Sequence, residues 1–276
     1  MITNKSIGYS GRLANQMFQY ATLISIGFKK GLTVKLPLRN ELVKFDGCLN
    51  LNNMKWIPYK LDLYNCFNLN SEKCTDEELS QLKYQYNEST FTFNPSVFDI
   101  QDFTSIGGYY QSPKYFEDTK KEVLQELKFK LEIEKEAEEF INRISNKEIV
   151  SVHVRRTDYV SSPTLNLLGS DYFKKALRYF IDNDYNFLIV SDDIPWCKEV
   201  LQSGDNVFFS EGHSPYVDLC MLSKCQHSII ANSSFSWWGA WMNSNPNKKV
   251  IAPHEWFRPQ TNIDCKDLYC KNWIVI

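Results

Sequence analysis

From residue 149 onward, short apolar runs alternate with helical segments in a regular order. The runs are IVSVHV (149–154), NFLIVSDD, NVFFS, HSIIANS and KKVIAP, and predicted helices such as 171–183 and 214–225 separate them. This alternation is typical of a parallel sheet covered by helices on both faces. It predicts an α/β domain over residues 148–276.

The N-terminal part carries a weaker α/β pattern. Apolar residues from Met17 to Phe28 recur at spacings of four, three and four, which predicts a helix over 16–30. The strand LTVKLP (32–37) follows it, so the chain opens as a βαβ unit. Helices are also predicted over 114–129 and 131–146. We therefore expect a first domain over 1–147, with the last segment of the chain, about 15 residues, packing back on it.

Bulk properties exclude several classes of protein. A net charge of −2 and a pI of about 6.1 argue against a nucleic-acid binder. No run of 18 apolar residues predicts a transmembrane helix, and the first residues lack the apolar core of a signal peptide. The 8 cysteines form no C-x-x-C pair, which disfavours zinc. We expect a cytoplasmic protein with reduced thiols, and peripheral membrane association stays open.

Polar residues gather where the C-terminal strands end. HVRRTD, SDD and NSS follow three of the runs, and His254 and Glu255 follow the last. Ligands of open parallel sheets bind outside the carboxyl ends of the strands, so these residues predict a ligand crevice. Since side chains alternate along a strand, one of Arg155 and Arg156 should enter the crevice, where a guanidinium suits phosphate.

Several of these polar residues have a second interpretation. Arg156 and Asp158 could form a supporting ion pair. Asp192 and Asp193 could cap the next helix, contact a ligand or bind a metal; adjacent carboxylates point apart, which makes a poor chelate. The Asp218 carboxylate suits either the dipole of its helix or a base such as guanine.

The NSS stretch leads into a helix that starts near Ser234. Ser233 and Ser234 at its positive end predict an anion site, although a simple N-cap is the alternative. The tryptophans of this helix (Trp237, Trp238 and Trp241) are spaced for core packing, and a sugar-facing role stays open.

The stretch GRLANQMFQYA (11–21) places more polar groups at a helix start than capping requires. Arg12, Asn15 and Gln16 are the excess. The chain has no G-x-G-x-x-G, no G-x-x-x-x-G-K-[ST] and no D-x-D at a strand end. A pyrophosphate held by arginine and a helix end, without a metal, fits these residues best.

Three motifs in this order, GRLANQMFQYA, HVRRTD and ANSSFSWWGAW, resemble the alpha-1,2-fucosyltransferase family. The resemblance extends to the APHEW and DLYCKNW segments, so it covers most of the chain. It implies a GT-B architecture of two Rossmann-like domains facing a cleft. It also implies an inverting, metal-independent transfer of fucose from GDP-fucose to the 2-hydroxyl of a galactose-terminated oligosaccharide, with no cofactor.

The resemblance also implies roles for individual residues. Arg155 would stabilise the departing GDP, His153 and Asp218 would lie near guanine, and Ser233 and Ser234 would meet the pyrophosphate. Arg12, Asn15 and Gln16 would reach the donor from the N-terminal domain.

Two points stay open under this resemblance. Asp158 is the nearest carboxylate to serve as a base, but a departing phosphate oxygen could take the proton instead. Ala14 stands where the family often has glycine, which would tighten the loop if its φ is positive.

Two alternatives to this function stay open. One is a fucosyltransferase of different linkage, and the other is a catalytically silent carbohydrate- or nucleotide-binding protein on the same fold. Acceptor choice is assigned to the weakly patterned segment 39–116.

Overall fold

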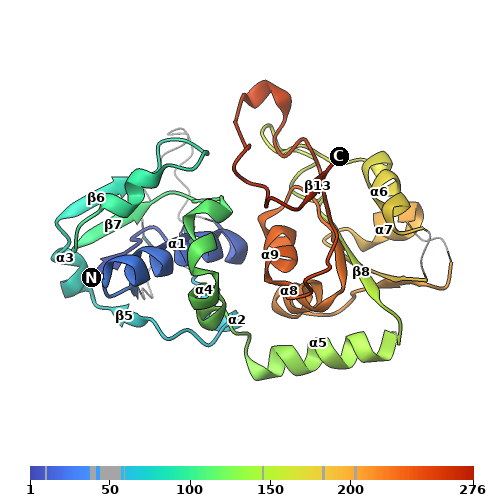
Figure 1. The fold of residues 1–276 in the computed structure, drawn as a ribbon, viewed down its shortest axis with the longest axis horizontal. Helices are drawn as coiled ribbons and strands as arrows, with labels where there is room; N and C mark the ends of the chain where they lie inside the picture. The colour runs from blue at the N-terminus through green and yellow to red at the C-terminus, as the bar shows by residue number, and fades with distance from the viewer. Residues whose placement is uncertain are drawn as a thin grey trace. The chain divides into compact units, whose positions relative to one another are not determined.

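The computed structural model describes residues 1–9, 11–37, 42–43, 57–58, 60–144, 146–181, 184–201 and 204–276. The chain forms two compact units (Figure 1): Met1–Lys128 with Lys266–Leu268, and Phe129–Cys265 with Tyr269–Ile276. The second unit begins earlier than the boundary expected at residue 148. The reason is α5 (Leu131–Ile144), which packs against α8 (Pro215–Lys224) and is tied to it by a 2.7 Å ion pair between Glu138 and Lys224.

The second unit is built on six parallel strands in the order β10-β9-β8-β11-β12-β13. The strands are β8 (Ile149–Val154), β9 (Asn186–Ser191), β10 (Val207–Phe209), β11 (His227–Ile229), β12 (Val250–Ala252) and β13 (Ile274–Val275). Helices α6 (Ser170–Leu177) and α7 (Ile194–Leu201) cover one face, and α8 and α9 (Ser234–Met242) cover the other (Figure 1). The sequence pattern predicted this arrangement except for β13, whose two residues are too few to show a period.

The central strand β8 is buried on both faces. Val150, Val152 and Val154 pack with Phe173 of α6 and Cys197 of α7 in the main apolar cluster. The alternate residues face α8 and α9. A doubly buried strand of this kind reads as a continuous apolar run, which explains why IVSVHV was recognisable from the sequence.

Helix α9 carries the three tryptophans into the core. Trp237 and Trp238 are fully buried and Trp241 is 4% exposed, so they are core residues and do not face a sugar. Their rings pack on one another at 5.1 to 6.1 Å between centroids. A Cβ on Gly239 would lie 2.6 Å from the Leu222 Cβ, so this glycine lets α8 and α9 approach closely.

The first unit holds a three-stranded parallel sheet in the order β1-β7-β6, with two further strand pairs, β2-β5 and β3-β4. Its strands are β1 (Ile2–Thr3), β2 (Lys35–Pro37), β3 (Leu42–Val43), β4 (Ile57–Pro58), β5 (Glu72–Cys74), β6 (Tyr84–Asn87) and β7 (Thr104–Gly107). Its helices are α1 (Leu13–Lys30), α2 (Leu63–Cys66), α3 (Asp76–Ser80) and α4 (Lys120–Glu126).

Helix α1 starts at Leu13, three residues before the predicted start, and ends at Gly31 in the left-handed conformation that suits glycine. A parallel bridge between Ile2 and Val34 closes the opening βαβ unit. Ala14 lies inside the helix, so no positive φ is required there. The positive φ values belong to Gly8 (90°) and Gly11 (86°) in the preceding loop.

The helix predicted over 114–129 is shorter than expected. Two 3-10 turns (Pro113–Tyr115 and Glu117–Thr119) precede α4, and Phe116 between them has an extended φ of −145° that interrupts the helix. Residues 38–41, 44–56 and 59 lie outside the described residues, and with them a large part of the segment to which acceptor choice was assigned.

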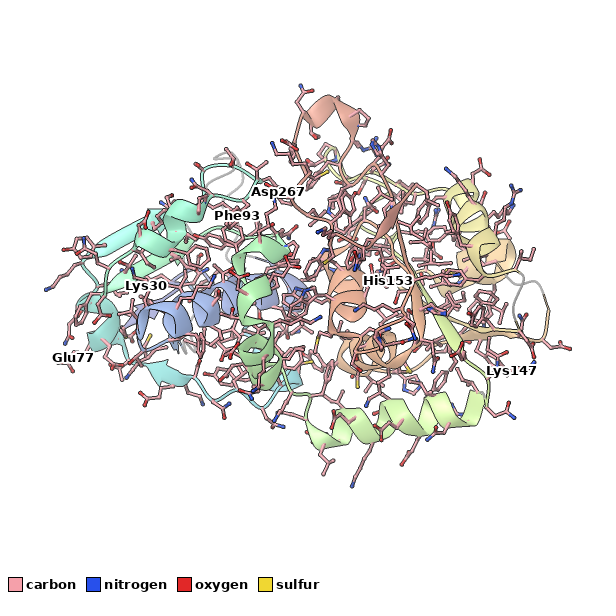
Figure 2. All side chains as sticks on the ribbon, viewed as in Figure 1. Lys30, Glu77, Phe93, Lys147, His153 and Asp267 are labelled. Atoms are coloured by element: carbon pink, nitrogen blue, oxygen red, sulfur yellow. The ribbon has the colours of Figure 1, made fainter. Side chains whose placement is uncertain are left out.

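The C-terminal segment is divided between the units. Lys266–Leu268 belongs to the first unit, where the Asp267 carboxylate accepts a hydrogen bond from the Phe93 N–H (3.0 Å) and pairs with Lys114 (2.5 Å). Figure 2 shows Phe93 and Asp267 as neighbours. The remaining residues return to the second unit, where β13 pairs with β12.

Candidate functional site

The strand order of the second unit identifies one edge for a ligand. β8 is followed along the chain by β9 on one side, whereas β11 lies on its other side, so the order reverses between β8 and β11. Such switch points are where open α/β sheets bind ligands. The loops that leave these two strands carry HVRRTD and NSS.

His153 lies near the carboxyl end of β8 (Figure 2). The residue is 5% exposed. Burial, helped by the nearby Arg155 charge, lowers its pKa to about 3, so the imidazole is neutral at physiological pH. Its ring lies 5.4 Å from that of Phe235, and its Nδ1 has no hydrogen-bond partner within the described part of the chain. A neutral ring in this position offers hydrogen bonding without charge.

Arg155 follows β8 and is held by two carboxylates. Its Nη2 lies 2.7 Å and its Nε 2.8 Å from Asp158 Oδ1, and its Nε lies 3.2 Å from Asp192 Oδ2. Burial alone would lower the arginine pKa, but the hydrogen bond to Asp158 and the charges of both carboxylates raise it overall. The side chain is 19% exposed, so this fixed cation stays accessible at the strand end.

Arg156 pairs with Asp193, and not with Asp158 as the alternative interpretation of the sequence had it. Arg156 points away from Arg155, donates from Nε to Asp193 (3.1 Å) and stacks over the Trp196 ring (4.0 Å). Strand alternation explains this difference, because neighbouring side chains leave on opposite faces. Asp158 therefore helps to hold Arg155.

Asp192 and Asp193 diverge, as the sequence predicted, and both have structural partners. Asp192 accepts hydrogen bonds from the Arg156 N–H (2.9 Å) and from the main-chain N–H and hydroxyl of Thr157, which shapes the loop after β8. Asp193 accepts from the Trp196 N–H (3.2 Å) and so caps α7. Within the described ranges, no three His, Cys, Asp or Glu side chains cluster as metal ligands.

Ser233 and Ser234 lie at the N-terminus of α9. Ser233 is the N-cap, and its Oγ accepts from the Phe235 N–H at 3.3 Å. Ser234 is the first helical residue and is partly exposed. This end of a nine-residue helix provides a positive dipole and main-chain donors beside β11.

Asn232, the first residue of the NSS stretch, joins the site loops, a role that the sequence did not predict. It is fully buried, and its Nδ2 donates to the carbonyls of Asn166 and Trp256, both at 2.7 Å. Its own carbonyl accepts from the Tyr159 hydroxyl at 3.0 Å. These contacts join segments between 24 and 73 residues apart, so no local spacing could have signalled them.

Asp218 lies in the first turn of α8, half-buried. The Ser210 hydroxyl donates to its Oδ1 at 2.5 Å, and burial raises its pKa to about 6. His213 contacts Glu136 of α5 at 2.6 Å and stacks edge-on against Phe140. Asp218 is thus an acceptor whose charge depends on pH near neutrality; Ser210 was missed, because a serine after a strand carries no specific signal.

The three candidate residues at the start of α1 differ in how exposed their side chains are. Arg12 is the exposed N-cap of α1, and Asn15 is half-buried. Gln16 is 1% exposed; its Nε2 donates to the carbonyls of Gly11 (3.2 Å) and Lys60 (2.7 Å), and its Oε1 accepts from the Asp62 N–H (2.8 Å). Both the amide nitrogen and the amide oxygen of Gln16 are hydrogen-bonded to the main chain. Gln16 therefore joins two loops, and its amide is not available to a ligand.

The α/β architecture recurs among solved structures. The fucosyltransferase NodZ from Bradyrhizobium matches with a TM-score of 0.52 at 14% identity, over 86% of this chain and 91% of that one. POFUT1 in complex with GDP matches with a TM-score of 0.51 at 15% identity, over 91% and 97%. The fold is thus of the GT-B type found in glycosyltransferases.

Sequence comparisons give the family. The model described as Glycosyl transferase family 11 matches residues 2–276, and the chain belongs to this family. An alpha-1,2-colitosyltransferase of Escherichia coli is 31% identical over 97% of both proteins. A galactoside alpha-(1,2)-fucosyltransferase 2 of Hylobates lar is 25% identical over 94% of this chain and 81% of its own length. None of the helices described for this chain is long and apolar enough to cross a bilayer.

Proposed function

We propose that the protein transfers L-fucose from GDP-fucose to the 2-hydroxyl of a terminal β-galactoside. The observation that carries the proposal is Arg155, held accessible at the β8–β11 switch point beside the N-terminus of α9, in a family 11 chain. A fixed guanidinium and a helix N-terminus are suited to a pyrophosphate. The relatives named as alpha-1,2-transferases support the linkage.

The reaction is an inverting displacement. The acceptor oxygen bonds to the anomeric carbon as the bond from that carbon to the β-phosphate oxygen breaks, and the electron pair leaves with GDP. Arg155 and the α9 N-terminus stabilise the growing phosphate charge, a type of contribution worth about 3 kcal/mol per donor. They perform the role that a divalent cation has at other pyrophosphate sites, so the proposed reaction uses no metal.

The acceptor proton has two possible destinations. Asp158 Oδ1 is committed to Arg155, which favours a positioning role for Asp158. We therefore assign the proton to the departing phosphate oxygen, with Asp158 as the competing base. Asp218 and the neutral His153 form the guanine subsite, and Arg12 and Asn15 are proposed as further donor-binding residues.

A second candidate function is colitosyl transfer. It is favoured by the 31% identity to the Escherichia coli colitosyltransferase. Colitose is fucose without its 3-hydroxyl, so the two donors share every phosphate and guanine contact proposed above. A donor panel of GDP-fucose and GDP-colitose, with lactose as acceptor, separates the candidates by relative kcat/KM.

The test of nucleotide binding is isothermal titration with GDP. We expect binding that is unchanged by EDTA; no binding in either condition would overturn the proposal. Release of GDP from GDP-fucose in the presence of lactose excludes a catalytically silent binding protein. Lactose, N-acetyllactosamine and galactosyl-N-acetylgalactosamine then fix the acceptor and linkage. We place the reaction in the cytoplasm.

A further inference from the structure

Arg155 and Tyr159 lie on one face of a single turn of chain that follows β8. The N–H groups of Tyr159 and Val160 both donate to the Arg156 carbonyl, at 2.9 and 3.0 Å. Residues four apart in such a turn lie side by side, and the Arg155 guanidinium carbon stands 5.8 Å from the centre of the Tyr159 ring. A cation and an aromatic ring attract each other at this separation, so the ring lies against the charge that we assign to phosphate.

The Tyr159 hydroxyl joins this turn to the N-terminus of α9. It donates to the Asn232 carbonyl at 3.0 Å in a buried position, and Asn232 directly precedes Ser233, the N-cap of α9. Burial raises the pKa of Tyr159 to about 12, although the Arg155 charge and a hydrogen bond with the Ser233 side chain lower it. The hydroxyl therefore stays protonated and remains a donor at physiological pH.

The N-terminus of α9 is also held by contacts other than this hydroxyl. The Asn232 side chain is fixed by its two hydrogen bonds to main-chain carbonyls, both at 2.7 Å. The Ser236 hydroxyl lies 3.3 Å from the Ala231 carbonyl and 3.2 Å from that of Ser233. The buried tryptophans anchor the rest of the helix in the core. The Tyr159 hydroxyl thus fastens the turn to the helix, which has its own supports.

The carboxylates that hold Arg155 come from other places. Asp158 belongs to the same turn, and Asp192 follows β9, which lies on the opposite side of β8 from β11. These carboxylates set the direction of the guanidinium, but they do not set its distance from α9. Within the described part of the chain, Nη1 of Arg155 takes no hydrogen bond or ion pair, so its N–H groups remain for a phosphate oxygen. A phosphate shared with α9 requires that distance to be fixed.

We propose that Tyr159 is a positioning residue for the transfer reaction, which fastens the Arg155 turn to the N-terminus of α9 so that both meet the same pyrophosphate. The inference rests on the proposed function. Tyr159 is 7% exposed and its hydroxyl is bonded to Asn232, so in this role it touches neither donor nor acceptor. Without the hydroxyl the turn can move relative to α9, and a misplaced guanidinium stabilises the developing phosphate charge less well.

Tyr159→Phe removes the hydroxyl and keeps the ring. We expect the variant to fold and to lower kcat with GDP-fucose about tenfold, because a displacement on the order of 1 Å can cost up to about 100-fold. The KM for the acceptor should stay within about twofold of the wild-type value, since the lost contact acts on the phosphate side of the donor. An unchanged kcat overturns the proposal. Loss of the fold also overturns it, because the hydroxyl would then have a purely structural role.

A double-mutant cycle with Arg155→Ala tests whether Tyr159 acts through Arg155. In the Arg155→Ala background, Tyr159→Phe should lower kcat by less than about twofold. The guanidinium that the hydroxyl aligns is then absent, and residues that act through one another are not additive. A further loss of about tenfold in this background would overturn the proposal.

Tyr172→Phe is the matched control. The Tyr172 hydroxyl likewise donates to a main-chain carbonyl close to NSS, that of Ile230 at 2.6 Å, but Tyr172 belongs to α6 and its ring packs on Phe173. The variant loses a hydrogen bond of the same kind, so its melting temperature should fall about as much as that of Tyr159→Phe. Its kcat should stay within about twofold of the wild-type value. A loss of kcat equal to that of Tyr159→Phe would overturn the proposal.

The wild-type protein distinguishes this inference from the function on which it rests. If the wild-type protein neither binds GDP nor turns over GDP-fucose, the proposed function fails. If it is active and the effects of Tyr159→Phe and Arg155→Ala are additive, only the positioning role of Tyr159 fails.

Discussion

Asp158 Oδ1 takes two contacts from one guanidinium, that of Arg155, at 2.8 Å from Nε and 2.7 Å from Nη2. With Asp192 on the same Nε, the cation is fixed before any ligand arrives. A fixed charge needs no reorganisation when phosphate charge develops, which is the condition for strong electrostatic catalysis.

We expect Arg155→Ala to lower kcat at least about 100-fold while the fold is retained, since the lost group acts on the developing charge. Arg155→Lys keeps the positive charge but loses the planar guanidinium that can hold two phosphate oxygens at once. Its kcat should therefore lie between those of Arg155→Ala and the wild type. Steady-state turnover of GDP-fucose measures both. Arg156→Lys is the matched control, because this arginine faces Trp196, and its turnover should be close to that of the wild type.

The role of Asp158 can be separated from that of a base. If it positions Arg155, Asp158→Asn keeps one acceptor oxygen and should lose about tenfold or less in kcat. If it is the base, the loss should match that of Arg155→Ala, and the acidic limb of the pH–rate profile should disappear. The pH dependence of kcat decides between them.

The raised pKa of Asp218 predicts that nucleotide binding depends on pH. Its pKa is raised to about 6, so the carboxylate that we propose as an acceptor for guanine is present above this pH and is lost as the pH falls through it. GDP affinity should therefore decline below about pH 6. The fold responds in the opposite direction: a raised carboxyl pKa means that the native state holds the proton more tightly than the unfolded state, so protonation of Asp218 stabilises the protein.

Titrations with GDP between about pH 5 and about pH 8 measure this effect. Asp218→Asn should bind GDP weakly and without the transition. Ser210→Ala should move the midpoint upward, because the Ser210 hydrogen bond lowers the pKa of Asp218. A wild-type affinity that stays constant through pH 6 would remove Asp218 from the guanine subsite.

The strands of the second unit could be predicted from the sequence better than those of the first, for a physical reason. Strands such as β8 are buried on both faces, so their apolar runs are visible in the sequence. In the first unit, β6 reads YQYN and is mostly exposed, which leaves no alternation to detect. The local period of the sequence therefore reveals the sheet of the second unit and the opening βαβ unit of the first, but not β6.

The same limit applies to the site. The strand-end position of Arg155 follows from one local run and was predictable. Partners such as Asp193 for Arg156 and Asn232 for Tyr159 come from distant loops and depend on where strand alternation sends each side chain. Gln16 looked like a ligand contact for the same reason, because its partners at Lys60 and Asp62 are remote in the chain.

Lys248 caps the C-terminus of the tryptophan-rich helix α9. Its Nζ lies 2.7 Å from the Ala240 carbonyl, 2.6 Å from that of Asn243 and 3.4 Å from that of Trp241. We expect Lys248→Met to lower the free energy of unfolding by about 1.5–3 kcal/mol, because charged hydrogen bonds to the helix end are lost. Thermal unfolding measures it, with Lys249→Met as the neighbouring control, for which a much smaller change is expected.

Substitutions of Arg12 and Gln16 should have different effects at the first helix, one on donor binding and the other on stability. Gln16→Ala leaves the Lys60 carbonyl and the Asp62 N–H without their partner in a buried position, so it should lower the melting temperature and cost about 1–3 kcal/mol per unsatisfied group. Arg12 is exposed, so Arg12→Ala should keep the melting temperature and raise the Kd for GDP-fucose. Thermal unfolding and donor titration of both variants give the two quantities. If Arg12→Ala leaves donor affinity unchanged, the N-terminal loop serves only to start α1, and if Gln16→Ala is as stable as the wild type, its amide is available to the donor after all.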